Sequence, residues 1–349
     1  MGDTTNTILV LGAGTSFGFG LPLGSGLRTT ISTDLNIMFD DWGSSLQSGS
    51  HEIVGALRLL VKSQDGTRGD INPHRLAAIQ ISRSMSLSSS IDEYIERHKD
   101  DTLKIQCAKL AIAKAILEAE RGSSIYADPA KRQDPLDRAS ESWLAYLLRD
   151  LTRGYAKSDL ADSISKITII NFNYDRCVQH FAYHWLQRIY DLSEAEAANI
   201  CKGLKIYHPY GSLGHLPHEA GSGSVPFGAE VSPQRLVEIA ARIQTYSEAV
   251  GELTEPSFVG SDLATARRLV FLGFGFHSQN IQVLGAGGGK RTTLRCYAST
   301  AGIRAPRPEI IKSQIADAMQ VQAPDGLFFE HVADSCEKFW EEFGDVLLQ

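Results

Sequence analysis

Small residues follow the first apolar run of the chain, within the stretch ILVLGAGTSFGFGLP at positions 8–22. Glycine has no Cβ, so a glycine-rich backbone can turn sharply and come close to a ligand. A helix that begins here would also offer free N–H groups and the positive end of its dipole to a pyrophosphate. The stretch predicts either a phosphate-binding loop or a tight strand-to-helix turn without a ligand. The residues concerned are Gly12, Ala13, Gly14, Thr15 and Ser16.

The spacing of these glycines bears on the kind of nucleotide protein that the chain can be. The stretch reads G-x-G-x-x-x-G, whereas the fingerprint of dinucleotide-binding dehydrogenases is G-x-G-x-x-G. Those enzymes also carry an acidic residue about 20 residues later, at the end of a second strand, where it binds the ribose. No acidic residue ends a second strand there in this chain. The pattern therefore argues against a dehydrogenase.

Polar side chains end the second apolar run, in the stretch INFNYDRCVQHF. Asn171, Asn173 and Asp175 alternate, so they would point to one face of an extended segment. A strand end that turns polar beside a glycine loop is where an open α/β sheet binds its ligand. Asp175 has a second interpretation, because it could also cap a helix that begins at Arg176. The segment predicts that Asn173 lies in a ligand site and leaves both roles open for Asp175.

A histidine and a tyrosine follow the third apolar run, in the stretch IYHPYGSLG. His208 and Tyr210 are two residues apart, so they would share a face of an extended chain, and Pro209 keeps His208 extended. A histidine at a strand end can act as a general base near neutral pH. A lone histidine is more often structural, and that alternative stays open here.

Glycines recur after the fourth apolar run, in the stretch LVFLGFGFHSQN. Gly273 and Gly275 would again bring backbone close to a ligand at the carboxyl edge of a sheet. We expect the segment around Phe274, together with Gly211 and Ser212, to form a wall on the adenosine and ribose side of a bound nucleotide.

Six apolar runs rich in β-branched residues can position these segments. They are mostly continuous rather than alternating, as expected for parallel strands that are buried on both faces. Helical patterns lie between them, and this alternation predicts an α/β fold with a Rossmann-like, doubly wound, mainly parallel six-stranded sheet. The predicted strands are Thr7–Leu11, Ile167–Asn171, Leu204–His208, Leu269–Gly273, Thr293–Ala298 and Leu327–Val332. The predicted helices include Trp143–Arg153, Arg176–Tyr190, Pro233–Val250, Pro308–Met319 and Ser335–Leu347.

A long segment separates the first two predicted strands. Its helical stretches are ISTDLNIMF, HEIVGALRLLVKS, SIDEYIERHK and LKIQCAKLAIAKAILEAER, and the last has an apolar stripe with a period near 3.6 residues. We expect one domain over residues 1–349, with a large helical insertion at about residues 40–160.

Composition narrows the function classes. The net charge of −7 argues against a general nucleic-acid-binding protein, because phosphate backbones require a basic surface. Five scattered cysteines, with no C-x-x-C, predict neither a disulfide framework nor a zinc ribbon. No signal peptide is recognised, and no run reaches the ~20 apolar residues that a membrane helix needs. We expect a cytoplasmic protein that binds no metal, no membrane and no nucleic acid directly.

Five of these segments, in this order, resemble motifs of the sirtuin family. GAGTSFGFGLP is similar to its G-A-G-x-S nucleotide loop, and NFNYD is similar to its Q-N-x-D stretch. YGSL, VPFGAEVSP and LVFLGFGFHS resemble H-G-S-L, V-x-F-G-E-x-x-P and L-x-x-x-G-T-S. SIDEYIERH also resembles a segment of prokaryotic sirtuin-like proteins.

Two departures distinguish the chain from protein deacylases of that family. It lacks the zinc ribbon that helps to shape the acyl-lysine cleft. Tyr210 stands where the family has its catalytic histidine, two residues after His208. The base would then be His208 or Tyr210, or the site would be inactive.

The resemblance is closer to the zinc-free prokaryotic branch of the family, and it implies an NAD hydrolase. Such enzymes deplete NAD in antiphage defence by abortive infection, form homo-oligomers and work with a partner ATPase or a phage-sensing protein. NAD would be the substrate, cleaved to nicotinamide and ADP-ribose or cyclic ADP-ribose. The implied catalytic residues are Asn173, His208, Asp175 and Tyr210. The implied NAD-binding residues are Gly12, Ala13, Gly14, Thr15, Ser16, Asn171, Gly211, Ser212, Gly273, Phe274 and Gly275.

Two other functions stay open at this point. A protein deacylase or ADP-ribosyltransferase would break the same bond and transfer a group to an acceptor. A nucleotide-sensing module would bind without catalysis, which the tyrosine at position 210 favours.

Overall fold

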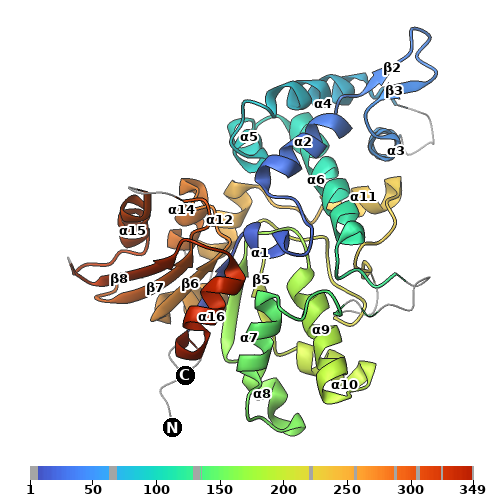
Figure 1. Ribbon diagram of the computed structural model, residues 1–349. Coiled ribbons are helices and arrows are strands. Elements are labelled where there is room, and N and C mark those ends of the chain that lie inside the picture. The colour runs from blue at the N-terminus through green and yellow to red at the C-terminus, as the bar shows by residue number, and fades with distance from the viewer. Residues whose placement is uncertain are drawn as a thin grey trace.

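A six-stranded, all-parallel sheet forms the centre of the computed structural model, which describes residues 7–62, 69–128, 134, 136–219, 223–254, 258–286, 289–303, 307–323 and 325–347. The strand order is β5-β4-β1-β6-β7-β8, with β1 in the interior (Figure 1). The strands are β1 (Thr7–Leu11), β4 (Ile167–Asn171), β5 (Lys205–Tyr207), β6 (Arg268–Leu272), β7 (Leu294–Ser299) and β8 (Leu327–Val332). This is the order of a Rossmann-like doubly wound sheet, whose direction of winding reverses between β1 and β6. The predicted fold class is confirmed.

Both faces of the sheet are buried, as the continuous apolar runs predict. In β1, Ile8 and Val10 belong to one apolar cluster, and Leu9 and Leu11 belong to the other. Successive strand residues point to opposite faces, so a strand with a covered layer on each side must be apolar throughout.

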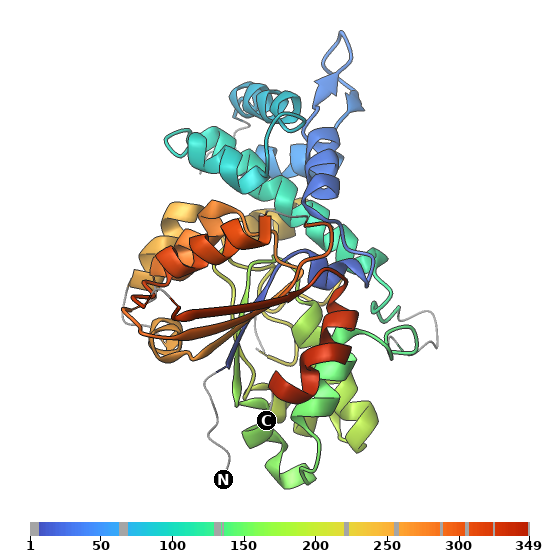
Figure 2. The ribbon, with the colours of Figure 1, turned by 60° about the vertical axis from the view of Figure 1, so that its left-hand side comes forward.

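One helical layer contains α7 (Trp143–Leu151), α8 (Leu160–Ile164), α9 (Cys177–Tyr190), α10 (Glu194–Cys201) and α16 (Cys336–Leu347). We call it the α9 side. The opposite layer contains α12 (Tyr246–Thr254), α13 (Phe258–Thr265), α14 (Ser278–Ala286) and α15 (Arg307–Ala318). Figure 2 shows the sheet between these two layers. The short helix α1 (Gly14–Phe17) lies at the carboxyl edge, where β1 ends.

The insertion stands above the carboxyl edge of the sheet (Figures 1 and 2). It comprises α2 (Gly24–Asp34), the hairpin β2 (Met38–Phe39) and β3 (Leu46–Ser48), α3 (His51–Leu60), α4 (Asn72–Ser84), α5 (Ile91–Arg97) and α6 (Thr102–Gly122). The later helix α11 (Pro233–Ala240) packs on α3 and α6. Because α7 packs on α9 and α16, the limits of the insertion in the structure lie nearer residues 24 and 122 than the expected 40 and 160.

Residues 36–39, predicted as helical, instead lead into the β2–β3 hairpin, so that part of the prediction is wrong. Helix α2 ends at Asp34, and the sequence Asp40-Asp-Trp-Gly43 makes a turn. The Asp40 carboxylate accepts a hydrogen bond from the backbone N–H of Ser44 at 2.7 Å, and Gly43 has a φ of 68°. These local turn interactions compete with continuation of the helix. Trp42, at the tip of the hairpin, is 91% exposed.

The predicted helix over Pro233–Val250 is also interrupted, because α11 ends at Ala240 and α12 begins at Tyr246. The backbone N–H of Thr245 donates to the Glu248 carboxylate at 2.5 Å, and the N–H of Glu248 donates to the Thr245 hydroxyl at 3.4 Å. This reciprocal pair is a capping box, which starts a new helix rather than extending the old one.

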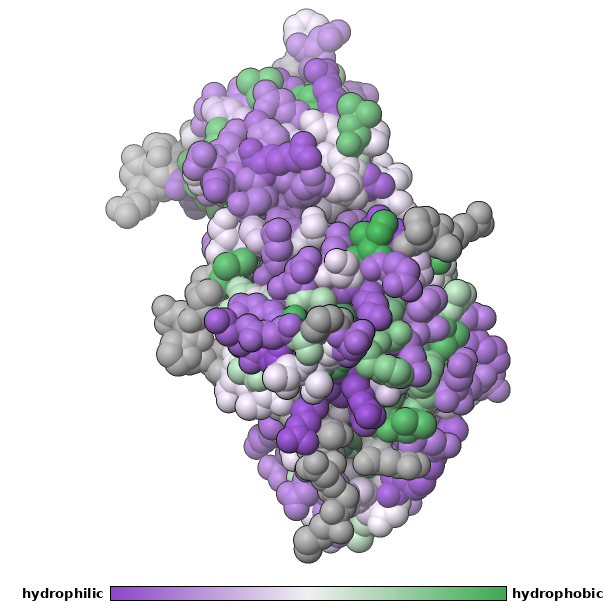
Figure 3. Space-filling model, turned by 90° about the vertical axis from the view of Figure 1, so that its left-hand side faces the viewer, coloured by the Kyte–Doolittle hydropathy of each residue, from purple (hydrophilic) through white to green (hydrophobic). Residues whose placement is uncertain are grey.

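Exposed hydrophobic side chains lie in small groups among hydrophilic ones on the face that Figure 3 shows. Within the described ranges, no helix combines the length and apolar character needed to cross a lipid bilayer. All five cysteines are buried and have free thiols.

Candidate functional site

The glycine loop lies where the winding of the sheet reverses, next to the loop that follows β6. The N–H groups of Gly12 and Gly14 donate to the carbonyls of Leu272 and Gly273, at 3.0 and 2.9 Å. The N–H groups of Thr15 and Ser16 donate within the loop, to Gly12 and Ala13. These four N–H groups are therefore engaged inside the protein in this conformation, and α1 is only four residues long. The expected cradle of free N–H groups at the start of α1 is not present.

Close contact between the glycine loop and the loop after β6 explains why positions 12, 14 and 273 are glycine. A Cβ on Gly12 or Gly14 would lie 2.7 or 2.6 Å from backbone atoms of the loop after β6. Gly273 has a φ of +54°, and a Cβ there would lie 2.3 Å from the backbone nitrogen of Thr15. Glycine is therefore required at these positions because the backbones of the two loops pack directly on each other, with no room for a Cβ between them.

Asn173 connects the end of β4 to the glycine loop. Its side-chain Nδ2 lies 3.0 Å from the carbonyl oxygen of Gly12 and 3.2 Å from the Thr15 hydroxyl. The residue is buried, at 9% exposed, and is held against the glycine loop by these contacts. Asn171, only 1% exposed, accepts a hydrogen bond from the backbone N–H of Asn173 at 3.1 Å. Asn171 therefore shapes the turn that presents Asn173.

Asp175 joins the glycine loop to the start of α9, as expected for a residue that caps this helix, and its role in a ligand site stays a prediction. Its Oδ1 accepts hydrogen bonds from the Ser16 hydroxyl and from the backbone N–H of Cys177, the first residue of α9, both at 3.1 Å. Burial raises the pKa of the Asp175 carboxyl, and the hydrogen bonds oppose that shift. The side chain holds α1 and α9 together at the edge of the sheet.

His208 lies directly beside Asn173. Its Nδ1 is 2.8 Å from the backbone carbonyl of Asn173, so Nδ1 carries the proton and donates. Its Nε2 is 2.9 Å from Nε2 of Gln179 on α9, so Nε2 accepts. Burial lowers the pKa of His208 to about 4; the Asn173 carbonyl opposes the shift, and Arg176 adds to it. His208 is thus a neutral imidazole with both ring nitrogens engaged.

Tyr210 lies on the other side of the sheet from His208, so the expectation that they share a face is wrong. The backbone N–H of Gly211 donates to the carbonyl of His208, which closes a turn through Pro209 and Tyr210. The Tyr210 side chain is 2% exposed and donates its hydroxyl to Asn280 of α14 at 2.8 Å. Burial raises its pKa further above the usual value for tyrosine. Tyr210 is a core residue, separated from His208 by the turn.

The remaining predicted binding residues have structural contacts of their own. Gly211 has a φ of +73°, and a Cβ there would lie 2.0 Å from the carbonyl oxygen of Arg242. The Ser212 hydroxyl accepts a hydrogen bond from the backbone N–H of Gly214. Phe274 is buried in a group of aromatic rings with Phe172, 5.2 Å away. Gly275 is less restricted, because a Cβ there would meet only the ring of His277, at 3.1 Å.

An acidic residue that the sequence analysis missed approaches this edge from the insertion. Tyr174, between Asn173 and Asp175, donates its hydroxyl to the carboxylate of Asp92 on α5. Burial raises the pKa of both groups, and the hydrogen bond from Tyr174 opposes the shift at Asp92. The available signal was the stretch SIDEYIERH, which contains Asp92. We call Asp92, Tyr174, Tyr210 and Asn280 the insertion side of the site.

A buried ion pair, also missed, joins the insertion to the start of α9. Arg176 and Glu120 are both fully buried, with Nη2 of the arginine 2.6 Å from Oε2 of the glutamate. Arg176 also donates to the carbonyls of Gly214, Val225 and Pro226. One guanidinium therefore fixes α6, α9 and the loop between β5 and α11.

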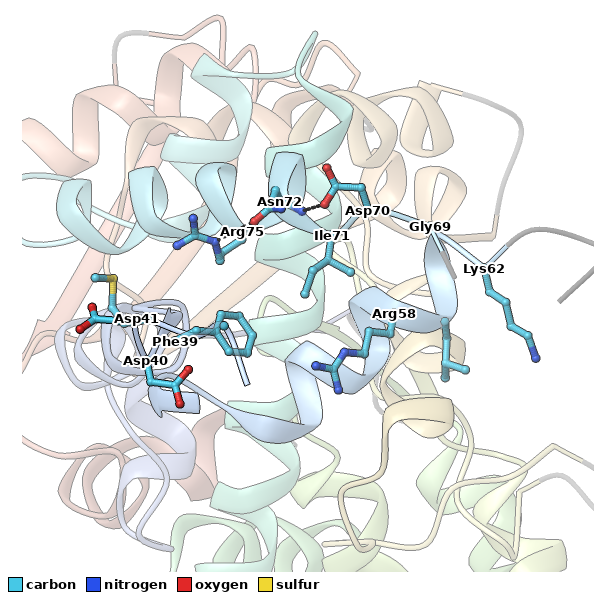
Figure 4. A pocket seen from close by; sticks show the side chains of 13 residues that line it. Phe39, Asp40, Asp41, Arg58, Lys62, Gly69, Asp70, Ile71, Asn72 and Arg75 are labelled. Carbon is cyan, nitrogen blue, oxygen red and sulfur yellow. Dashed lines mark hydrogen bonds between the residues drawn. The ribbon is translucent and has the colours of Figure 1, made fainter. Parts of the chain in front are cut away.

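A separate pocket of about 810 Å³ lies within the insertion, at the base of the hairpin (Figure 4). Phe39, Ile71 and Arg58 line it, together with Asp40 and Arg75. None of the predicted site residues lines this pocket, so it is distinct from the candidate site. Among the residues that the structure describes, no group of three or more histidine, cysteine, aspartate or glutamate side chains could hold a metal ion.

The structure brings Asn173 and Asp175 to the glycine loop, places His208 behind Asn173 and beside α9, and places Tyr210 elsewhere. No family model, curated protein or solved structure matches the chain.

Proposed function

We propose that the chain hydrolyses NAD at the bond between nicotinamide and ribose, giving nicotinamide and ADP-ribose. One observation carries the proposal: Asn173 touches the glycine loop with its side chain and holds His208 with its backbone carbonyl. The glycine loop that Asn173 touches lies where the winding of the sheet reverses, which is where open α/β sheets bind nucleotides.

The reaction needs little proton transfer at the leaving group. Nicotinamide leaves as a neutral molecule, so the main requirement is to stabilise an oxocarbenium-like ribose and to orient water. In the proposal, Asn173 orients the water and the ribose hydroxyls. Asp175 holds Ser16 and the start of α9 in place around them.

His208 supplies the base through Nε2, because Nδ1 is occupied by the Asn173 carbonyl. A ribose hydroxyl or water would replace the Gln179 amide that now donates to Nε2. Gln179 also has a buried Oε1 with no partner in the described part of the chain, so its side chain is incompletely satisfied where it stands. Movement of Gln179 is thus the step that would expose the base.

The sirtuin-like motifs alone support the proposed cellular role. In that role, the chain forms a homo-oligomer that works with a partner ATPase or a phage-sensing protein. It depletes NAD in the cytoplasm, which is antiphage defence by abortive infection. The released sugar nucleotide is linear or cyclic ADP-ribose.

A second candidate function is a nucleotide-sensing module without catalysis. Four N–H groups of the glycine loop and both ring nitrogens of His208 are already engaged, which favours this alternative. The two candidates differ in one measurement, because only the enzyme releases nicotinamide from NAD.

The test is nicotinamide release by the full chain and by two variants. Asn173→Ala and His208→Ala should each lower turnover by about 10²–10⁴-fold, as loss of a positioned catalytic group does. Asn199→Ala and His51→Ala replace exposed residues of the same types and should leave turnover unchanged. A folded Asn173→Ala variant that releases nicotinamide at the wild-type rate would contradict the site assignment. Tight NAD binding without release by the wild-type chain would support the sensing module instead.

A further inference from the structure

A second recess lies at the amino edge of the sheet, where β6, β7 and β8 begin. Its volume is about 590 Å³, within the roughly 300–1,000 Å³ typical of small-molecule sites. The strands here are five or six residues long, so this edge is about 16–20 Å from the glycine loop. The residues used below are Arg268, Arg295, Asp325, Tyr297 and Phe328, and Arg267 also lines the recess.

Positive charge predominates in this recess. Arg268 is only 9% exposed and gives one hydrogen bond to the carbonyl of Leu347. Its Nε is buried and has no hydrogen-bond partner in the described part of the chain. Among the described residues, the Arg268 guanidinium bonds to this carbonyl and to no acidic side chain. Burial lowers the pKa of Arg268, Tyr297 opposes the shift, and the charge of Arg295 adds to it. A buried cation without an acidic partner is costly, and a bound anion would reduce that cost.

An exposed aromatic ring lies in the same recess. Phe328 is 47% exposed, and its ring packs edge-on against Tyr297 with the ring centres 6.3 Å apart. A simple anion would make no use of this ring, whereas a nucleobase can stack on it. The carboxylate of Asp325 can accept hydrogen bonds from sugar hydroxyls or a base amine.

We infer that this recess is a nucleotide-binding site, separate from the candidate site at the glycine loop. Arg268 and Arg295 bind the phosphates, Phe328 stacks on the base, and Asp325 accepts from the sugar or the base. The ligand class is a small nucleotide with one or two phosphates. The inference does not depend on whether the chain cleaves NAD, because it is tested by binding.

The first experiment measures binding of ADP, pyrophosphate and adenosine to the full chain by calorimetry. Arg295→Ala should weaken ADP binding about tenfold or more, since hydrogen bonds to charged groups contribute about 1.5–3 kcal/mol. Phe328→Ser should weaken ADP binding about fivefold or more and leave pyrophosphate binding unchanged. Arg83→Ala and Ile310→Ser, which alter exposed residues elsewhere, are the matched controls and should have no effect.

The second experiment locates the bound ADP by hydrogen exchange, because a nucleotide could also bind at the glycine loop. ADP should protect backbone amides at residues 291–297 and 325–329. Protection confined to residues 12–16 and 273–276 would overturn the inference, as would equal ADP affinity in Arg295→Ala and Arg83→Ala. Tighter binding of a single-stranded DNA ten-mer than of ADP would also overturn it and assign the recess to nucleic acid.

Discussion

Residues 173–175 follow β4 and point alternately to the α9 side and to the insertion side of the carboxyl edge. The two sides differ in chemistry. On the α9 side, Asn173 and Asp175 bond to backbone and hydroxyl groups beside a neutral histidine. On the insertion side, Tyr174 bonds to a buried carboxylate that is 82 residues away in the sequence. The difference shows that the insertion is part of the edge of the candidate site, because it supplies the acid that faces this segment.

The largest effect on stability should come from breaking the buried ion pair between Arg176 and Glu120, which joins the insertion to the start of α9. Arg176→Met would leave Glu120 buried without its cation, so we expect a loss of about 3–5 kcal/mol in the free energy of unfolding. Urea denaturation measures it. Arg188→Met on α9 removes exposed ion pairs with Asp134 and Asp137 and should cost less than about 1 kcal/mol. Similar losses in the two variants would contradict the role given to Arg176.

Gly273→Ala tests the loop contact on which the α9 side rests. We expect a loss of roughly 2–4 kcal/mol, because the variant combines a left-handed backbone conformation with a Cβ 2.3 Å from the Thr15 nitrogen. Gly302→Ala is the control: its φ is +75°, but a Cβ there would meet nothing within 4 Å. Thermal or urea unfolding should separate the two variants, and equal losses would show that backbone conformation alone requires glycine.

Tyr174→Phe removes the contact with the insertion and leaves the α9 side intact. The Asp92 carboxylate would lose its donor, so we expect destabilisation of about 1–3 kcal/mol. Tyr246→Phe removes an exposed hydroxyl, 3.0 Å from Gln282, and should change stability by less than about 0.5 kcal/mol. Denaturation curves that coincide for the two variants would argue against a structural role for Asp92.

The smallest expected effect is on the pH dependence of stability, which should have opposite signs for the histidines of the α9 side and for Asp92 of the insertion side. His218 belongs to the α9 side, because its ring stacks on Tyr183 of α9 with the ring centres 3.9 Å apart. Burial lowers the pKa of His208 and His218 to about 4, so the unfolded chain binds more protons than the folded chain below pH 6.5. These histidines therefore destabilise the fold as the pH falls from about 6.5 to 4. Burial raises the pKa of Asp92, which acts in the opposite direction. Unfolding at pH 7 and pH 5 should show a smaller decrease for His218→Gln than for His51→Gln, an exposed control.

Local sequence patterns were sufficient to predict the sheet, the glycine loop and the positions of Asn173 and Asp175. Mostly continuous apolar runs located all six strands to within about one residue at each end, because burial on both faces leaves few polar positions. The glycines at positions 12, 14 and 273 marked the loops where the winding reverses. The alternation of Asn173 and Asp175 held, since both reach the glycine loop or α1.

The other contacts of the candidate site could not be predicted from local patterns, because they join distant parts of the chain. Glu120 meets Arg176 across 56 residues, and no local period shows which buried acid will find which buried base. Tyr210 turned away from His208 because the turn at Gly211 is held against the end of α11, where the N–H of Gln244 donates to the Tyr210 carbonyl. The placement of the insertion, and so of Asp92, follows from packing that the sequence does not encode locally.

The exposed tryptophan of the β2–β3 hairpin has a practical consequence for spectroscopy. Of the four tryptophans, Trp143, Trp185 and Trp340 are 1–7% exposed, whereas Trp42 is 91% exposed. Iodide should therefore quench one fluorophore selectively and leave the blue-shifted emission of the other three. Loss of that quenching would report, without any label, that another molecule has covered the tip of the hairpin.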